Sequence, residues 1–161
     1  MSSLRVGVGY DVHRVVPRRR LVLAGVEIPA AIGLSGHSDA DVITHSLCDA
    51  LLGAANLGDI GLHFPDSDPT YRDVNSLELL SKVVEMVKEK GWTPINVDCT
   101  LVSQSPKIQP YAQQMRAALA ERLGLSPEEV SVKATTNEGI GFVGRGEGMA
   151  AYCVALLQAK E

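Results

Sequence analysis

Hydrophobic and polar positions follow two different rhythms along the chain, one typical of β-strands and one typical of α-helices. Apolar residues that alternate with small or polar ones, or form short runs, predict strands. Such segments are residues 4–10, 20–28 (one or two strands), 95–101, 130–135 and 149–157. Apolar residues spaced three or four positions apart predict helices over residues 38–58, 76–91 and 110–124. The predicted order is therefore β-β-α-α-β-α-β-β.

This order of elements predicts a mixed α/β fold. A helix between two strands can return the chain to the same sheet, so we expect a single mixed β-sheet with its helices packed on one face. The chain has 161 residues, of which 45% are hydrophobic, and we expect one domain over residues 1–161. No predicted element is left to cover the other face of the sheet. We therefore expect oligomerisation to cover it.

Charge and composition exclude several classes of partner. The net charge is −4, which argues against nucleic acid or an anionic membrane as the partner. The sequence contains no long apolar stretch and no leader before the first strand, so the cytoplasm is the predicted compartment. The three cysteines, Cys48, Cys99 and Cys153, lie far apart in apolar segments. They are predicted to be buried free thiols.

Side chains that can bind a metal ion are concentrated near the N-terminus, where all 4 histidines lie within the first 68 residues. Asp11 and His13 stand two apart at the end of a predicted strand, so their side chains project to the same side. His45 lies on the first predicted helix, four residues from both Asp41 and Asp49. Together, Asp11, His13 and His45 predict a zinc site with an open fourth position, as in catalytic zinc centres.

Simpler interpretations of these residues remain open. Asp11 and His13 alone could be a hydrogen-bonded pair at a strand end. His45 could pair its charge with the acidic face of its own helix. If the zinc site exists, Asp41 or Asp49 is expected to accept a hydrogen bond from His45 and thereby orient it.

Two further segments are rich in residues that form turns. Residues 59–61 (DIG) and 63–69 (HFPDSDP) predict an active-site loop, with an acidic surface turn as the alternative. Residues 135–148 contain five glycines, which would let backbone N–H groups approach an anion, so phosphate is the predicted ligand. The segment matches neither the P-loop nor the dinucleotide-binding pattern, so a glycine-rich hairpin without a ligand is the alternative.

As a set, these residues closely resemble the family of 2-C-methyl-D-erythritol 2,4-cyclodiphosphate synthase, an enzyme of non-mevalonate isoprenoid biosynthesis. Motifs of this family occur in order along nearly the whole chain. They are GVGYDVHR (7–14), GVEIP (25–29), GLSGHSDADV (33–42), DALLGAANLGDIG (49–61), HFPDSDP (63–69), KATTNE (133–138) and GRGEG (144–148). So many motifs in one order make the resemblance highly specific.

The resemblance implies a cyclisation reaction. The family's substrate is 4-diphosphocytidyl-2-C-methyl-D-erythritol 2-phosphate, whose own 2-phosphate attacks the β-phosphorus of the diphosphate and releases CMP. The product is 2-C-methyl-D-erythritol 2,4-cyclodiphosphate, and the enzyme is a phosphorus-oxygen lyase. Because the nucleophile is an anionic phosphate of the substrate, the protein has to fold the substrate and stabilise charge.

The resemblance also implies roles for individual residues. Asp11, His13 and His45 would bind Zn²⁺, which polarises the β-phosphate as a Lewis acid, and Glu138 would hold a second ion, Mg²⁺ or Mn²⁺. His37 and Thr136 would stabilise the transition state. The implied substrate contacts are Asp11, Val12, His13, His37, Ser38, Asp59, Ile60, Gly61, Phe64, Pro65, Asp66, Ser67, Asp68, Ser103, Gln104, Ser105, Pro106, Lys107, Ile108, Gln109, Thr135, Thr136, Asn137, Glu138, Phe142 and Arg145.

Within this set, the erythritol part of the substrate would lie against residues 59–61 and 64–68, with Asp66 as the expected hydroxyl partner. The cytidine would lie in the loop 103–109, held largely through backbone groups, with Lys107 near the diphosphate. Gln109 and its neighbour Ile108 depart from the apolar residues frequent in this loop. Recognition through the backbone should tolerate that departure.

The resemblance further implies a homotrimer with active sites between neighbouring subunits and with the sheets facing a shared interior. Such an assembly would cover the sheet face that the predicted helices leave open. Phe142 and Arg145 match residues that line the central channel of relatives, where an isoprenoid diphosphate is a proposed ligand.

Two other functions compete with this interpretation. A zinc-dependent phosphohydrolase would use the open metal position to ionise water. A non-catalytic trimeric metal-binding module would use the metal only to tie the strands to the first helix.

Overall fold

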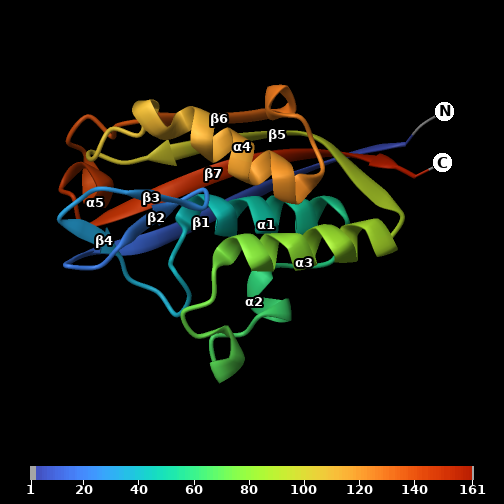
Figure 1. Cartoon of the computed structure of the whole chain (residues 1–161), viewed down its shortest axis with the longest axis horizontal. Coiled ribbons are helices and arrows are strands. Elements are labelled where there is room, and N and C mark those ends of the chain that lie inside the picture. Colours follow the sequence, from blue (N-terminus) through green and yellow to red (C-terminus); the bar gives the residue numbers. More distant parts are fainter. Residues whose placement is uncertain (1–2, 161) are drawn as a thin grey trace.

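The computed structural model, which describes residues 3–160, contains a five-stranded mixed β-sheet with helices on one face (Figure 1). The strands are β1 (Leu4–Pro17), β2 (Leu21–Leu23), β3 (Val26–Ile28), β4 (Ile32–Leu34), β5 (Trp92–Val102), β6 (Val130–Thr135) and β7 (Gly148–Ala159). The helices are α1 (Val42–Ala54), α2 (Ile60–His63), α3 (Ser76–Glu89), α4 (Ala112–Leu123) and α5 (Gly141–Gly144), with 3₁₀ turns at Pro69–Tyr71, Gln109–Tyr111 and Pro127–Glu129. The strand order in the sheet is β4-β1-β7-β5-β6, and β2 and β3 form a separate two-stranded sheet.

The directions of the strands follow from their connections. β5 and β6 are parallel because α4 carries the chain back from the end of one strand to the start of the other. The pairs β1–β4, β1–β7 and β5–β7 are antiparallel. The loops that follow β5 and β6 therefore leave the sheet at the same end.

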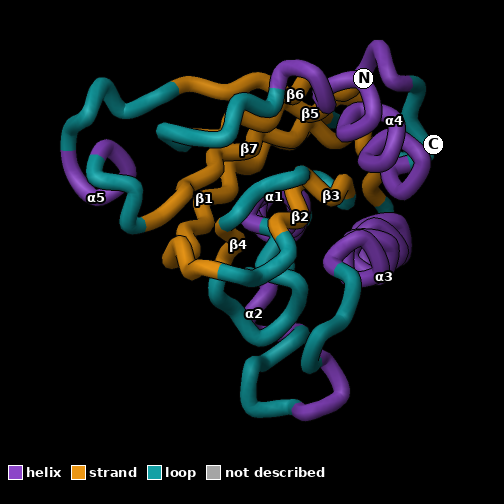
Figure 2. Tube along the Cα trace, turned by 60° about the vertical axis from the view of Figure 1, so that its left-hand side comes forward, coloured by secondary structure: helices purple, strands orange, loops and turns teal. Residues whose placement is uncertain are grey.

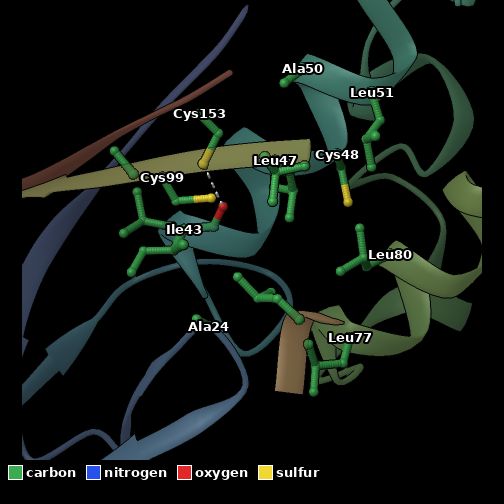
Figure 3. Close-up of a cluster of buried hydrophobic side chains, with 14 of the residues drawn as sticks. Ala24, Ile43, Leu47, Cys48, Ala50, Leu51, Leu77, Leu80, Cys99 and Cys153 are labelled. Carbon is green, nitrogen blue, oxygen red and sulfur yellow. Dashed lines mark hydrogen bonds between the residues drawn. The ribbon is translucent and has the colours of Figure 1, made fainter. Parts of the chain in front are cut away.

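Three helices cover one face of the sheet and form the hydrophobic core with it. α1 lies on β1 and β7, α3 lies beside α1, and α4 packs against β6 (Figures 1 and 2). Figure 3 shows the centre of this core, where Ile43 and Leu47 of α1 lie near Cys99 and Cys153 of the sheet. The three cysteines are buried free thiols, as predicted, and the Cys153 thiol lies 3.6 Å from the Ile43 carbonyl oxygen.

β1 turns its glycines toward α1. A Cβ atom at Gly9 would lie 1.8 Å from the Ser46 carbonyl oxygen, and one at Gly7 would lie 2.0 Å from the Ala50 carbonyl oxygen. Both contacts are with helix backbone, so only a residue without a side chain lets α1 approach β1 this closely. The two glycines thereby set the distance between the strand and the helix.

The opposite face of the sheet is apolar and uncovered. Val6 and Val8 of β1 are each 69% exposed, and Tyr152 and Val154 of β7 are 50% and 42% exposed. These side chains alternate with buried residues on the same strands, so they share one face. An exposed apolar face of this kind is typical of a surface that another protein chain covers.

The predicted fold class is confirmed, with corrections at several elements. The strand predicted over residues 4–10 continues to Pro17, so it includes Asp11 and His13. Residues 20–28 form two strands, but these make the separate hairpin rather than part of the main sheet. The first helix begins at Val42, with Asp41 as its N-cap, and not at Ser38. Within residues 3–160, no helix is both long and apolar enough to cross a membrane.

The glycine-rich segment 135–148 does not form a hairpin. It ends β6, forms the one-turn helix α5 and enters β7. Gly139, Gly141 and Gly146 have φ angles of 73°, 71° and 71°, which side chains disfavour. A Cβ atom at Gly144 would lie 2.1 Å from the carbonyl carbon of Gly139. The path of the backbone thus accounts for these glycines without a ligand, and anion binding there stays a prediction.

Candidate metal site and two pockets

Asp11 and His13 of β1 and His45 of α1 converge on one point. One ligand atom from each residue lies within 4.8 Å of the other two. His13 Nε2 is 2.8 Å from Asp11 Oδ2 and 3.1 Å from His45 Nδ1. Asp11 and His13 face the same side of their strand, as predicted, and the close approach of α1 to β1 brings His45 beside them.

The hydrogen-bond partner of His13 Nδ1 determines which ring nitrogen of His13 carries the proton. His13 Nδ1 lies 2.7 Å from the Ser35 carbonyl oxygen, which can only accept a hydrogen bond, so Nδ1 carries the hydrogen. In the neutral imidazole the lone pair of Nε2 then points at Asp11 Oδ2. A histidine that binds a metal through one ring nitrogen usually donates a hydrogen bond from the other ring nitrogen.

The centre of the cluster fits a divalent cation. Asp11 Oδ2 is buried and, among the described residues, has no hydrogen-bond partner. Burial disfavours the charged forms of Asp11 and His13. Contacts with the two imidazoles nevertheless lower the pKa of Asp11 to about 2. The contact with Asp11 likewise raises the pKa of His13. The cluster therefore favours positive charge at its centre. One carboxylate oxygen and two imidazole nitrogens are ligands suited to zinc.

The prediction that Asp41 or Asp49 orients His45 is wrong. The carboxylate of Asp41 is buried and accepts hydrogen bonds from the Thr44 backbone N–H and from two N–H groups of the turn between β2 and β3. Asp49 accepts a hydrogen bond from the Ile60 N–H at 2.7 Å. Each aspartate lies four residues from His45, but Asp41 binds backbone N–H groups and the Thr44 hydroxyl, and Asp49 binds a backbone N–H group, instead of His45.

Two serine hydroxyls contact His45 in place of a carboxylate. His45 Nε2 lies 2.8 Å from Ser76 Oγ and 3.1 Å from Ser38 Oγ. Ser76 is the first residue of α3, and its hydroxyl also contacts the carboxylate of Asp39. Sequence analysis predicted Ser38 as a substrate contact but missed Ser76 and Asp39. A serine near a helix start is ordinarily a cap, so the sequence carried no separate signal for this role.

The metal cluster opens into a pocket of about 470 Å³, here called the metal pocket. The predicted contact residues that line it are Asp11, His13, His37, Ser38, Ile60, Gly61, Phe64, Pro65, Asp66 and Ser67. Tyr71 and Leu79 also line it and were not predicted. The segment from α2 to α3, which forms one wall, extends away from the sheet (Figure 2). His37 Nε2 lies 3.3 Å from the Asp68 carbonyl oxygen in this segment.

A second pocket, of about 510 Å³, lies where the parallel strands β5 and β6 end, and is here called the loop pocket. The predicted contact residues that line it are Ser103, Gln104, Pro106, Lys107, Ile108, Gln109, Thr135 and Thr136. The Ser103 N–H donates to the Thr135 carbonyl oxygen at 3.0 Å, and Gln104 Oε1 accepts from the Asn137 N–H at 2.7 Å. The two loops are thus tied together. Ligands often bind at the carboxyl ends of parallel strands.

The two pockets share no residue, so one chain does not bring all predicted site residues together. His37 lies in the metal pocket and Thr136 in the loop pocket. The predicted residues that line neither pocket are Val12, Asp59, Asp68, Ser105, Asn137, Glu138, Phe142 and Arg145. Glu138 is exposed and does not belong to the metal cluster.

Several of the residues outside the pockets have other contacts. Asp59 and Asp68 cap the short helices that follow them. Arg145 pairs with Glu147 at 2.8 Å. The Val12 side chain lies on the uncovered face of the sheet, opposite Asp11 and His13, so contact with a ligand in the metal pocket would use its backbone.

Comparison with known proteins finds relatives over nearly the whole chain. The model of the YgbB family matches residues 4–158. A protein of Syntrophomonas wolfei named 2-C-methyl-D-erythritol 2,4-cyclodiphosphate synthase is 58% identical over 155 residues, which are 96% of this chain and 99% of that protein.

Two solved structures are similar along the full length of the chain. The bifunctional IspDF of Campylobacter jejuni is 44% identical with a TM-score of 0.96, and the match covers 100% of this chain and 44% of that longer chain. IspF of Plasmodium falciparum, described as a CDP complex, is 30% identical with a TM-score of 0.87, and the match covers 100% of this chain and 99% of that one.

Proposed function

Because the chain belongs to the 2-C-methyl-D-erythritol 2,4-cyclodiphosphate synthase family, we propose that its metal pocket and its loop pocket are two halves of one active site. The chain is a lyase of isoprenoid biosynthesis that cyclises its substrate and releases CMP. The observation that carries the proposal is the convergence of Asp11, His13 and His45 at a pocket of about 470 Å³.

The metal pocket would hold the diphosphate and the erythritol part of the substrate. Asp11, His13 and His45 would bind the cation, proposed to be Zn²⁺, which when bound withdraws charge from a phosphate oxygen as a Lewis acid. The attacking group is the substrate's own phosphate, so no residue has to act as a strong base. The His37 imidazole lies in the same pocket and would donate a hydrogen bond to the phosphoryl group as charge develops. Asp66 would accept from a substrate hydroxyl.

The loop pocket would hold the cytidine end. Its walls are the loop 103–109 and the end of β6, and a cytidine nucleotide as ligand is supported by the Plasmodium falciparum relative described as a CDP complex. Lys107 would pair with the phosphate of the departing CMP. Thr136 would donate its hydroxyl to the diphosphate, and Glu138 would hold a second ion, Mg²⁺ or Mn²⁺.

A homotrimer would bring the two halves together. Each chain, a single domain over residues 1–161, would give its metal pocket to one active site and its loop pocket to the next. The uncovered apolar face of β1 and β7 supports this proposal, because it would become the shared interior. Phe142 and Arg145 would lie near the central channel, where an isoprenoid diphosphate could bind. A cytoplasmic location is part of the proposal.

The proposal is tested by incubating the purified protein with 4-diphosphocytidyl-2-C-methyl-D-erythritol 2-phosphate and separating the products. A cyclic diphosphate together with CMP is the expected result, with Zn²⁺ found in the protein as isolated. A linear phosphate would instead identify the protein as a phosphohydrolase. Activity that survives both chelation and Asp11→Ala would contradict the proposed metal site.

The non-catalytic alternative is tested with His45→Ala. If the metal only ties β1 to α1, this variant should unfold or lose its assembly. If the metal serves the reaction, the variant should keep the wild-type mass and circular dichroism spectrum and lose the activity.

A further inference from the structure

We propose that Ser76 is a positioning residue for the metal site: its hydroxyl, held by Asp39, accepts the hydrogen of His45 Nε2 and so directs the lone pair of His45 Nδ1 at the cation. The inference rests on the proposed metal site and adds to it a residue of α3. Ser76 is far from the metal ligands in sequence and does not line the metal pocket.

The direction of the hydrogen bonds follows from the number of hydrogens available. The Ser76 hydroxyl has one hydrogen, and the Asp39 carboxylate beside it can only accept. The hydroxyl therefore donates to Asp39 and has only lone pairs left for His45. Because Ser76 Oγ lies 2.8 Å from His45 Nε2, the hydrogen between these two atoms has to belong to the imidazole.

Asp39 holds Ser76 in this orientation through both of its oxygens. Oδ1 accepts from the Ser76 hydroxyl, and Oδ2 accepts from the Ser76 backbone N–H at 3.0 Å. The Asp41 N–H also donates to Oδ1, at 3.2 Å, and helps to hold the carboxylate in place. Ser76 is 0% exposed, so no water competes for its hydroxyl. The carboxylate also lies at the N-terminus of α3, where the helix dipole favours a negative charge.

The second serine beside His45 cannot impose the same proton position. Ser38 Oγ lies 3.1 Å from His45 Nε2 and accepts a hydrogen bond from the Ala40 N–H. No carboxylate takes its hydroxyl hydrogen among the hydrogen bonds of the described residues. Ser38 can therefore either donate to His45 or accept from it, whereas Ser76 can only accept.

The two histidines of the site are thus fixed by different means. His13 donates to a backbone carbonyl oxygen, which no substitution removes, whereas His45 depends on a side chain. Without the Ser76 hydroxyl, the hydrogen of His45 could move to Nδ1. It would then face Asp11 Oδ2, which lies 3.3 Å from Nδ1, and would occupy the position of the cation. Loss of Ser76 should therefore weaken metal binding without removing a ligand.

The experiment measures the affinity of the full-length protein for Zn²⁺ by competition with a chromogenic chelator. Ser76→Ala should bind Zn²⁺ about 10–100-fold more weakly than the wild type, the usual effect of losing a hydrogen-bond partner behind a metal ligand. Ser76→Thr, which keeps a hydroxyl, should bind more tightly than Ser76→Ala. Ser46→Ala is the matched control, because Ser46 is equally buried, next to His45 in sequence, and bonded to Ile43 and Cys153 instead.

A second measurement reads the proton position directly. In ¹⁵N-resolved imidazole spectra of the metal-free protein, His45 should carry its hydrogen on Nε2 in the wild type and shift toward Nδ1 in Ser76→Ala. Wild-type Zn²⁺ affinity in a folded Ser76→Ala variant would overturn the inference, as would a wild-type His45 protonated on Nδ1. If Asp11→Ala leaves Zn²⁺ binding unchanged, the proposed metal site itself is wrong, and the inference falls with it.

Discussion

The metal pocket and the loop pocket of the same chain are built in opposite ways. The metal pocket takes side chains from β1, α1, the loop before α1 and the segment from α2 to α3, and hydrogen bonds behind the metal-binding cluster fix His13 and His45. The loop pocket is formed by two loops tied through backbone and amide groups, with Lys107 and Gln109 exposed on its wall. The first should therefore depend on individual side chains and the second on the path of the backbone.

The largest effect is expected at the metal pocket itself. Asp11→Ala removes the proposed carboxylate ligand, and because a bound metal contributes several kcal/mol, the cyclisation rate should fall by at least about 10³-fold. A cyclisation assay measures the loss, and circular dichroism and mass measure the fold and assembly. Glu128→Ala, which removes an exposed carboxylate outside both pockets, is the control and should keep wild-type activity. If Asp11→Ala is as active as Glu128→Ala, the metal pocket does not depend on this side chain and the contrast with the loop pocket is wrong.

The next effect tests whether the pockets need a neighbouring chain. Val8 is 69% exposed on the uncovered face, and Val8→Lys would bring like charges together in the interior of the proposed trimer, at a cost of several kcal/mol. The variant should sediment as a monomer and lose on the order of 10²-fold or more of the activity while staying folded. Ala117→Lys, at an exposed position of α4, should leave the trimer and its activity intact. A fully active monomer would contradict the shared site.

A third prediction concerns the packing that places His45 beside β1. Gly9→Ala would put a methyl group into the α1 backbone and should lower the free energy of unfolding by roughly 1–3 kcal/mol. Zn²⁺ affinity should fall as well, because α1 has to move away from β1. Gly53→Ala, within α1 and with nothing within 4 Å of its would-be Cβ, should be neutral or slightly stabilising. Thermal unfolding and chelator competition measure both variants.

The smallest effect is expected at Gln109, an exposed side chain of the loop pocket. Gln109→Ala should change the KM by less than about threefold, because the proposed recognition of the nucleotide relies on the backbone and a surface side chain contributes little. Lys107→Ala is the matched contrast, and loss of the proposed charged contact of Lys107 with phosphate should raise the KM about tenfold or more. Steady-state kinetics distinguish the two variants. A large effect of Gln109→Ala on the KM would show that a side chain, and not the backbone, recognises the base.

Much of the metal site was predictable because ligand chemistry resides in residue type and spacing. The D-x-H pattern at a strand end fixes the side on which Asp11 and His13 lie, and the helix that carries His45 is evident from its periodicity. The hydrogen bonds behind the ligands were not predictable. Asp41 and Asp49 have suitable spacing, but the choice between His45 and a backbone N–H depends on how distant segments pack.

The fold was predictable in class and less so in detail. The alternating pattern of β1 predicts a strand but does not indicate which side of the strand faces the helices. In the structure, glycines such as Gly9 face the helices and Val8 faces outward. The usual expectation that apolar side chains lie in the core fails because α1 requires close contact with the backbone of β1. The short elements β4, α2 and α5 were missed because three or four residues carry too little periodicity.

Mixing subunits tests the central claim, that one active site combines the metal pocket of one chain with the loop pocket of another. Asp11→Ala removes a proposed metal ligand of the metal pocket, and Lys107→Glu brings a carboxylate against the substrate's phosphates in the loop pocket, so each variant should have little activity alone. When the two are unfolded, mixed in equal amounts and refolded, about a quarter of the sites should have both halves intact, and activity should reappear in that proportion. If the mixture has no more activity than the separate variants, each chain builds a complete site of its own and the account is wrong.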